Sequence, residues 1–199
     1  MDDGGGKKEE RTRRIVETAM ALAERGGFDA VRLRDVASMA DVALGTLYKR
    51  FRSKDDILVA ALELNIERME RGLAEKGLPG STPADRVASF FKKVTRQMVR
   101  NANLSRAVLR AVGSGTPESA EKVMRFRGRV SHMVATVLRD GPGGNVLDDE
   151  RARMVASLLQ DIWYASLVGW TAGLYKEAEV NTRVRHAAEL LVRGAEEIR

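Results

Sequence analysis

Residues 44–54 concentrate the groups of this chain that could bind a polyanion. Four of these residues are basic, none is acidic, and Thr46 and Tyr48 add hydroxyl groups. Leu47 and Phe51 lie four residues apart, which is the spacing that places two side chains on one buried face of a helix. The segment is therefore predicted to be a short helix whose outer face carries positive charge.

A second short segment, residues 33–40, precedes this helix and also has the apolar spacing of a helix. Residues 41–43 join the two segments. Two short helices on a three-residue turn, with the second helix basic, form the layout of a DNA-reading helix-turn-helix. The alternative is an ordinary helical hairpin with a solvated basic face, because basic faces are common on helices.

The residue types of the second helix suit both tasks of a DNA-reading helix. Gly45 lets the backbone come near base edges in the major groove, and Leu44 and the Thr46 methyl group can pack on thymine methyls. Contacts to phosphates fix the register of a protein on the duplex without reading its sequence. The candidates for phosphate or backbone contact are Arg32, Arg34, Tyr48, Lys49, Arg50 and Lys54.

Three stretches around these helices, residues 28–37, 40–48 and 51–58, resemble the N-terminal domain of the tetracycline-repressor (TetR) family of bacterial transcription regulators. The resemblance extends over residues 12–62, and its most specific part is Gly-Thr-Leu-Tyr followed by Phe and by Ser-Lys. It implies a homodimer whose recognition helices enter successive major grooves, about 34 Å apart, on a near-palindromic operator. It also implies a repressor that binds a small-molecule effector in a C-terminal helical bundle, with residues 54–77 as the helix that transmits binding.

Three positions depart from the usual TetR pattern. Asp41 stands where the turn often has glycine, and Asp tolerates the left-handed region better than most residues. Ala43 replaces the usual capping serine, which predicts a loss of about 1 kcal/mol of helix stability. Arg50 stands where an aromatic residue or histidine is frequent, so phosphate binding is expected to depend more on charge and hence on salt.

The composition of the chain limits the other classes of function. With 199 residues, 44% of them hydrophobic, the chain can bury a core, and its formal charge of +6 favours anionic partners. It has no cysteine, which excludes disulfides, cysteine-ligated metals and thiol catalysis. The acidic, glycine-rich start is unlike a signal peptide, and no apolar run approaches the roughly 20 residues of a membrane span. We therefore expect a cytoplasmic protein.

An enzyme is the second class of function that we considered. The two histidines, His132 and His186, each stand alone on a predicted helix, without metal-ligand spacing to acidic residues. Residues 141–144 are glycine-rich but lack the Lys-Ser/Thr that follows in a phosphate-binding loop. We expect no enzymatic activity, no cofactor and no metal. The alternative to a regulator is a helical adaptor or scaffold protein without specific DNA binding.

Helical spacing recurs along the whole chain, so the predicted fold class is all-α with about nine helices. We expect the first helix to stop at Gly26 and Gly27, and Ser53 to cap the helix that follows the helix-turn-helix. The clearest break is the Gly- and Pro-rich segment 77–83. The predicted parts are a disordered tail at 1–7, a three-helix helix-turn-helix domain at 8–53, a linking helix at 54–77, and an effector-binding and dimerisation domain at 78–199.

Beyond this break, apolar and aromatic residues recur at helical spacing in several segments. Stripes rich in Met and aromatic residues around a helical bundle are typical of an adaptable apolar pocket. Plain core packing is the alternative for any single residue. The candidate effector-binding residues are Phe90, Phe91, Val94, Met98, Leu109, Val112, Met124, Met133, Trp163 and Trp170.

The stretch between Asp85 and Glu118 contains no acidic residue. A solvated surface usually mixes both signs of charge, so this stretch indicates an anionic partner. Our hypothesis is an effector with an apolar body and an anionic head, such as an acyl or steroid coenzyme A thioester, and the alternative is a merely basic surface. The basic residues of the stretch are Arg86, Lys92, Lys93, Arg96, Arg100, Arg106 and Arg110.

Small residues recur every four positions late in the chain, where they would let two helices approach closely. The last helix carries a similar face of small and apolar residues. Packing of these two helices against their copies would give a symmetric four-helix interface, and packing within one chain is the alternative. The candidate interface residues are Ala165, Gly169, Gly173, Ala188, Leu191 and Ala195.

Overall fold

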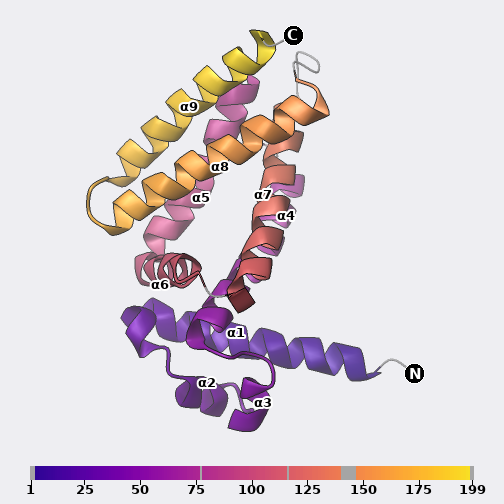
Figure 1. Cartoon of the computed structure of the whole chain (residues 1–199), viewed down its shortest axis with the longest axis vertical. Coiled ribbons are helices and arrows are strands. Elements are labelled where there is room, and N and C mark those ends of the chain that lie inside the picture. The colour runs from indigo at the N-terminus through magenta and orange to yellow at the C-terminus, as the bar shows by residue number, and fades with distance from the viewer. Residues whose placement is uncertain (1–2, 77, 116, 140–146, 198–199) are drawn as a thin grey trace. The chain divides into compact units, whose positions relative to one another are not determined.

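The computed structural model describes residues 3–76, 78–115, 117–139 and 147–197. Within these ranges the chain forms nine helices and no strand, as the helical spacing predicts. No described helix is long and apolar enough to cross a membrane. In chain order (Figure 1), the helices are α1 Asp3–Ala30, α2 Leu33–Met39, α3 Leu44–Tyr48, α4 Lys54–Lys76, α5 Pro83–Arg100, α6 Ala102–Gly113, α7 Pro117–Arg139, α8 Asp149–Thr171 and α9 Glu177–Glu197.

The helices form two compact units. Unit 1 comprises Met1–Asn65 and Asn101–Met124, and unit 2 comprises Ile66–Arg100 and Arg125–Arg199. Helices α4 and α7 therefore contribute residues to both units. The units do not follow the predicted division at residue 77, because α6 and the start of α7 fold with the N-terminal helices.

Unit 1 is built around α1, against which both α2 and α6 pack. Its core includes the fully buried side chains of Ile15, Val36 and Leu47, and Phe28, near the end of α1, packs against that core. An apolar face of α6 is buried in the same core. Its members are Leu104, Ala107, Val108 and Ala111. Helix α6 is thus a structural part of the helix-turn-helix unit.

The C-terminal end of α1 agrees with the prediction, and its N-terminal end does not. The helix begins at Asp3, so residues 3–7, predicted as a disordered tail, are helical although glycine is a poor helix former. Arg50 holds the following turns of this helix by donating to the Thr12 hydroxyl. Adding residues to an existing helix costs less free energy than starting a new one, so the helix extends to Asp3. At the other end the backbone leaves the helical conformation at Gly26 and Gly27, with a φ of 68° at Gly27, as predicted.

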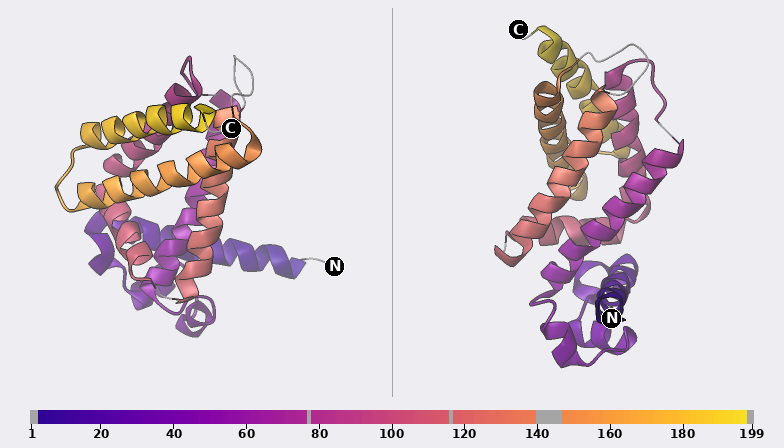
Figure 2. Two further views of the ribbon diagram at one scale, coloured as in Figure 1. Left: turned by 45° about the horizontal axis from the view of Figure 1, so that its top comes forward. Right: turned by 90° about the vertical axis from the view of Figure 1, so that its right-hand side faces the viewer.

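Unit 2 is a helical bundle in which α9 packs against both α5 and α8. Helices α8 and α9 run antiparallel and side by side (Figures 1 and 2). The Phe91 ring lies between Phe90 and Trp163, with 5.3 Å between ring centroids on each side. The indole Nε1 of Trp163 donates a hydrogen bond of 3.0 Å to the Thr95 hydroxyl. Aromatic packing and one buried hydrogen bond therefore join α5 to α8.

Helix α8 ends at Thr171, two residues before a glycine. Gly173 has a φ of 77°, its N–H donates to the Trp170 carbonyl, and the Leu174 N–H donates to the Gly169 carbonyl. This left-handed glycine ends the helix in the way typical of helix C-termini. Gly173 therefore does not lie on a helical stripe with Ala165 and Gly169. The glycine-rich loop predicted at residues 141–144 lies outside the described residues.

Candidate nucleic-acid interface

The turn between α2 and α3 has the predicted helix-turn-helix geometry. Asp41 adopts a φ of 53°, the left-handed conformation that Asp tolerates. The Val42 N–H donates a 3.0 Å hydrogen bond to the Ala37 carbonyl, which closes the turn. Leu47 and Phe51 point into the core at 0% and 3% exposure, as their spacing predicts. The helix itself is shorter than residues 44–54, because α3 ends at Tyr48.

Burial of this face leaves most of the predicted DNA-contact residues at the surface. Gly45 is exposed, and a Cβ built there would meet no atom within 4 Å, so the backbone can be approached closely. Tyr48 is 51% exposed, and Leu44 and Thr46 are half-buried beside Gly45. The remaining exposed members of the predicted set are Arg32, Arg34 and Lys49.

Two of the predicted phosphate contacts are engaged within the protein. The Arg50 guanidinium donates from Nε to the Thr12 hydroxyl at 2.8 Å and from Nη2 to the Lys8 carbonyl at 3.2 Å. The Lys54 ammonium donates to the Phe28 carbonyl at 3.2 Å and lies 4.0 Å from the centre of the Phe28 ring. Both cations brace α1, so a phosphate would have to share them with these contacts.

The two helix N-termini near the interface are capped differently. Ala43, the residue before α3, offers no side-chain hydrogen bond to the helix, as its type predicts. Ser53 caps α4 as predicted, because its hydroxyl accepts from the Asp56 N–H at 3.1 Å. The Asp56 carboxylate in turn accepts from the N–H of Arg52, the residue before the cap, at 3.2 Å.

Two residues of α6, Arg110 and Asn103, hold this helix against the end of α1. The Arg110 guanidinium lies 4.0 Å from the centre of the Phe28 ring, which carries Lys54 at the same distance. The Asn103 amide donates to the Glu24 carbonyl at 3.2 Å. These contacts fix α6 to the segment at the end of α1. Their only signal in the sequence is the basic stretch that includes Arg110, which we assigned to a ligand.

A polar hollow of about 350 Å³ lies beside the turn. Two arginines of α1 that the sequence analysis also left out, Arg11 and Arg14, line it together with Asp41, Val42, Ala43 and Thr46. Both arginines are exposed. In the sequence these arginines belong to a cluster of basic residues that begins at Lys7, the last residue of the predicted disordered tail.

The predicted effector residues are divided between the two units. Those in unit 2 form its interior: Phe90, Phe91, Met133, Trp163 and Trp170 are buried, and Val94 and Met98 are half-buried. The other three, Leu109, Val112 and Met124, belong to unit 1. Val112 packs against the helix-turn-helix core, and Met124 is 66% exposed.

The predicted dimer residues lie mostly inside one chain. Ala188 and Ala195 are buried by packing of α9 within unit 2, Leu191 is half-buried and Ala165 is exposed. A Cβ at Gly169 would come within 2.4 Å of the Tyr175 ring, so this glycine accommodates its own chain. The exposed large hydrophobic side chains of α8 and α9 are instead Met154, Leu158, Val168 and Leu190.

The part of the chain that the structure describes contains no cluster of three or more His, Asp or Glu residues that could hold a metal ion. His132 and His186 are both exposed. The Glu70 carboxylate is bound by Arg129 and belongs to no such cluster among the described residues.

Comparisons with known proteins agree with this arrangement. The family model for bacterial regulatory proteins of the tetR family matches residues 15–61, and the model for the tetracyclin repressor-like C-terminal domain matches residues 80–191. The HTH-type transcriptional repressor KstR of Mycolicibacterium smegmatis is 34% identical over 194 residues, which cover 98% of this chain and 92% of that protein. The fatty acid metabolism regulator protein of Bacillus subtilis is 27% identical over 103 residues, 50% of this chain and 51% of that protein.

Solved structures of TetR-family regulators have the same fold. A TetR transcriptional regulator from Rhodococcus sp. RHA1 superposes with a TM-score of 0.81 over 93% of this chain and 97% of that chain, at 24% sequence identity. The two family models together cover more than half of the sequence, and they fall on the helix-turn-helix and on the C-terminal bundle. The chain is a DNA-binding transcriptional regulator, not an enzyme, and it belongs to the TetR family.

Proposed function

We propose that this regulator is a repressor that binds a near-palindromic operator as a homodimer and is released by a small apolar effector with an anionic head. The observation that carries the proposal is the outer face of α3, with an exposed Gly45 between half-buried Leu44 and Thr46 on a properly closed turn. The KstR protein that matches nearly the full chain is named as a repressor, which supports the direction of regulation. Such a protein acts in the cytoplasm, where its DNA is.

The roles of the interface residues follow from their exposure. Leu44, Gly45 and Thr46 would read base edges, and exposed Arg32, Arg34, Tyr48 and Lys49 would hold phosphates, with Arg50 and Lys54 contributing charge from behind. The test is operator binding as a function of salt. Lys49→Ala should flatten the dependence of log K on log salt by about 0.9 for each phosphate lost, with sequence preference kept. Thr46→Ala should change the sequence preference instead, and a protein without any site-specific binding would contradict the proposal.

The homodimer is proposed to form through the outer faces of α8 and α9. Met154, Leu158 and Val168 are each 43–45% exposed and recur on one side of α8, and Leu190 on α9 is 70% exposed. Exposed apolar side chains in a row favour a protein partner, and a symmetric contact needs only a second copy. Val168→Glu should therefore shift the protein from dimer to monomer in analytical ultracentrifugation. The matched control is Arg153→Glu on the same helix; a dimer that survives Val168→Glu contradicts this interface.

The apolar body of the effector would occupy unit 2. The aromatic and Met side chains of this unit come from α5, α7 and α8, and such side chains adapt to apolar ligands. The Bacillus subtilis relative is named as a regulator of fatty acid metabolism, which supports a long apolar effector here.

The anionic head is supported by Arg86 on α5. This residue is 7% exposed, and its Nε and Nη1 atoms are buried without a hydrogen-bond partner among the described residues. Buried guanidinium groups are nearly always paired, because an unpaired buried charge is strongly unfavourable. A carboxylate or phosphate of the effector would supply the missing partner. The other basic residues of the stretch that surrounds Arg86 are mostly exposed and need no such explanation.

Thermal shift measurements with dodecanoate, dodecanoyl-coenzyme A and dodecanol test the effector. The wild-type protein should be stabilised more by the two anionic probes than by the alcohol. Arg86→Met should remove this difference while raising the stability of the ligand-free protein, because an apolar side chain replaces an unpaired charge. Equal affinity for the free acid and the thioester would argue against coenzyme A recognition. Loss of stability in Arg86→Met with unchanged ligand preference would make Arg86 a structural residue.

A further inference from the structure

Helix α1 begins upstream of the residues that match the family model of the TetR DNA-binding domain. The match to the TetR DNA-binding domain begins at residue 15, whereas the helix begins at Asp3. The additional turns are rich in positive charge. Their basic residues are Lys7, Lys8, Arg11, Arg13 and Arg14.

These additional turns are held against the segment that follows the recognition helix. Arg50, just after α3, donates one hydrogen bond to the Thr12 hydroxyl at 2.8 Å and another to the Lys8 carbonyl at 3.2 Å. The Thr12 hydroxyl donates in turn to the Lys8 carbonyl at 2.8 Å. The first turns of α1 therefore have a fixed position relative to α3, and the hydrogen bonds of Arg50 hold them there.

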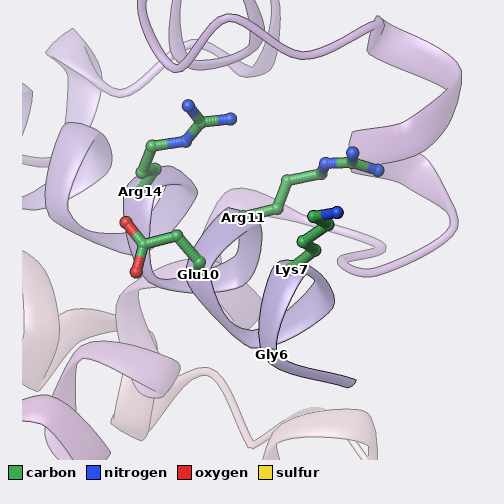
Figure 3. A pocket seen from close by; sticks show the side chains of 5 residues that line it. All are labelled: Gly6, Lys7, Glu10, Arg11 and Arg14. Atoms are coloured by element: carbon green, nitrogen blue, oxygen red, sulfur yellow. The ribbon is translucent and has the colours of Figure 1, made fainter. Parts of the chain in front are cut away.

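Arg11 and Arg14 border two hollows on these turns of α1. One, of about 350 Å³, includes residues 41–43 and Thr46 of the recognition helix in its lining. The other, of about 420 Å³, is lined by Gly6, Lys7 and Glu10 as well as the two arginines. Figure 3 shows Arg11 and Lys7 extending to one side of the helix, and Arg14 extending to the other side above Glu10.

The charges of the two arginines are available to a ligand. Arg11 and Arg14 are exposed and make no ion pair with any described residue. Asp41 is the acidic residue of the hollow beside the turn, so two cations face one carboxylate there. Arg13, on the same helix, differs because its Nε binds Glu17 at 3.1 Å. A hollow with excess positive charge next to a residue of the recognition helix suits an anion of the DNA backbone.

We propose that Arg11 and Arg14 bind a backbone phosphate of the operator beside the groove that Thr46 enters. Arginine binds phosphate oxygens through several parallel N–H donors, which fixes orientation as well as distance. The contact would set the register of α3 on the duplex from the side of α1, and Arg50 would position it through Thr12. The inference rests on operator binding through α3, but it adds a separate site on the turns of α1 that precede the residues matched by the family model.

The test compares the double variant Arg11→Ala/Arg14→Ala with wild type in operator binding at several KCl concentrations. We expect affinity to fall by on the order of tenfold or more at moderate salt, and the slope of log K against log salt to fall by about 0.9 for each phosphate contact removed. Preference between operator and base-substituted operators should stay unchanged. Arg13→Ala is the matched control, since it removes a positive charge from the same helix but outside the hollow.

A second variant tests the hydrogen bond between Arg50 and Thr12 without removing a charge. Thr12→Val should reduce the slope in the same direction as the double variant but by less, because Arg50 would keep only its hydrogen bond to the Lys8 carbonyl. Circular dichroism of each variant should show the helical content of wild type. The proposal is overturned if the double variant retains the slope of Arg13→Ala, or if Thr12→Val binds as wild type does. Absence of specific binding by the wild-type protein would instead contradict the proposed function.

Discussion

The ammonium group of Lys122 donates a hydrogen bond to the carboxylate of Asp56, and this contact joins the start of α7 to the first turn of α4 inside unit 1. Asp56 is 5% exposed, and the same carboxylate accepts from the Arg52 N–H. The Lys122 ammonium also lies 5.0 Å from the centre of the Phe51 ring. One buried acid thus organises the N-terminus of α4 and the residues after the recognition helix.

Removal of Lys122 should destabilise unit 1 more than removal of a surface lysine. In Lys122→Ala the buried Asp56 carboxylate loses its cation, and breaking a buried ion pair by removing one partner costs about 3–5 kcal/mol. Urea unfolding at pH 7 measures the change in the free energy of unfolding. Lys92→Ala, at an exposed position of α5, is the control and should change it by less than about 0.5 kcal/mol. Equal effects of the two substitutions would show that the pair adds nothing.

The helix-turn-helix could be predicted from the sequence because its evidence is local. The spacing of Leu47 and Phe51 defines the buried face, and Asp41 between α2 and α3 tolerates the left-handed conformation of the turn. The same holds for the helix stop at Gly26 and Gly27 and for the cap at Ser53, which depend on neighbouring residues alone.

The partner of α6 could not be predicted because it depends on tertiary packing. The apolar spacing of α6 shows that one face is buried, but the same spacing would suit a bundle of unit 2 or the core around α1. Arg110 illustrates the difficulty: a basic residue in a one-sign stretch indicated a ligand, whereas the structure places its guanidinium on the Phe28 ring. Gly173 is similar, since only the backbone shows that it ends α8.

Ala43→Ser should stabilise the recognition helix. Ala43 precedes α3 with an extended backbone, and its side chain makes no hydrogen bond to the helix. A serine hydroxyl there can accept from the Thr46 N–H, which is worth about 1 kcal/mol at a helix N-terminus. Thermal unfolding should show a higher melting temperature for Ala43→Ser than for wild type. Ala43→Val, which adds atoms without an acceptor, is the control, and an equal rise in both variants would exclude capping as the cause.

The Glu70–Arg129 pair should make the stability of unit 2 depend on pH. Arg129 donates to both Glu70 oxygens, at 3.0 Å and 2.5 Å, and this hydrogen bonding lowers the pKa of Glu70 below its ordinary value of 4.5 against the opposing effect of burial. A lowered folded-state pKa stabilises the protein at pH values above the ordinary pKa, and the contribution disappears as the pH falls through the lowered value. Both side chains are 39% exposed, so solvent screening limits it to about 0.5 kcal/mol.

Glu70→Gln tests this dependence. The variant should be less stable than wild type at pH 7, and the difference should shrink as the pH falls below 4.5 and the Glu70 carboxyl group of the wild-type protein becomes protonated. Urea unfolding at a series of pH values measures both curves, with Glu67→Gln on the same helix as the control. A difference that stays constant as the pH falls would assign the effect to packing instead of charge.

Thr95→Val should destabilise unit 2 through a single hydrogen bond. The hydroxyl of Thr95 accepts from the Trp163 indole at 3.0 Å, and the two residues are 1% and 6% exposed. Valine keeps the shape of threonine but leaves the buried indole N–H without its acceptor, which costs about 1–3 kcal/mol. Urea unfolding measures the loss, and tryptophan fluorescence reports the altered environment of the indole.

A second substitution separates the hydrogen bond from packing. Trp163→Phe removes the donor, so in that background Thr95→Val should cost much less than in wild type, because no buried polar group is left unpaired. The difference between the two costs is the coupling free energy, which should reach at least about 0.5 kcal/mol for residues in direct contact. Additive effects would mean that the hydrogen bond between α5 and α8 contributes nothing, and that the aromatic packing of Phe91 on Trp163 alone joins the two helices.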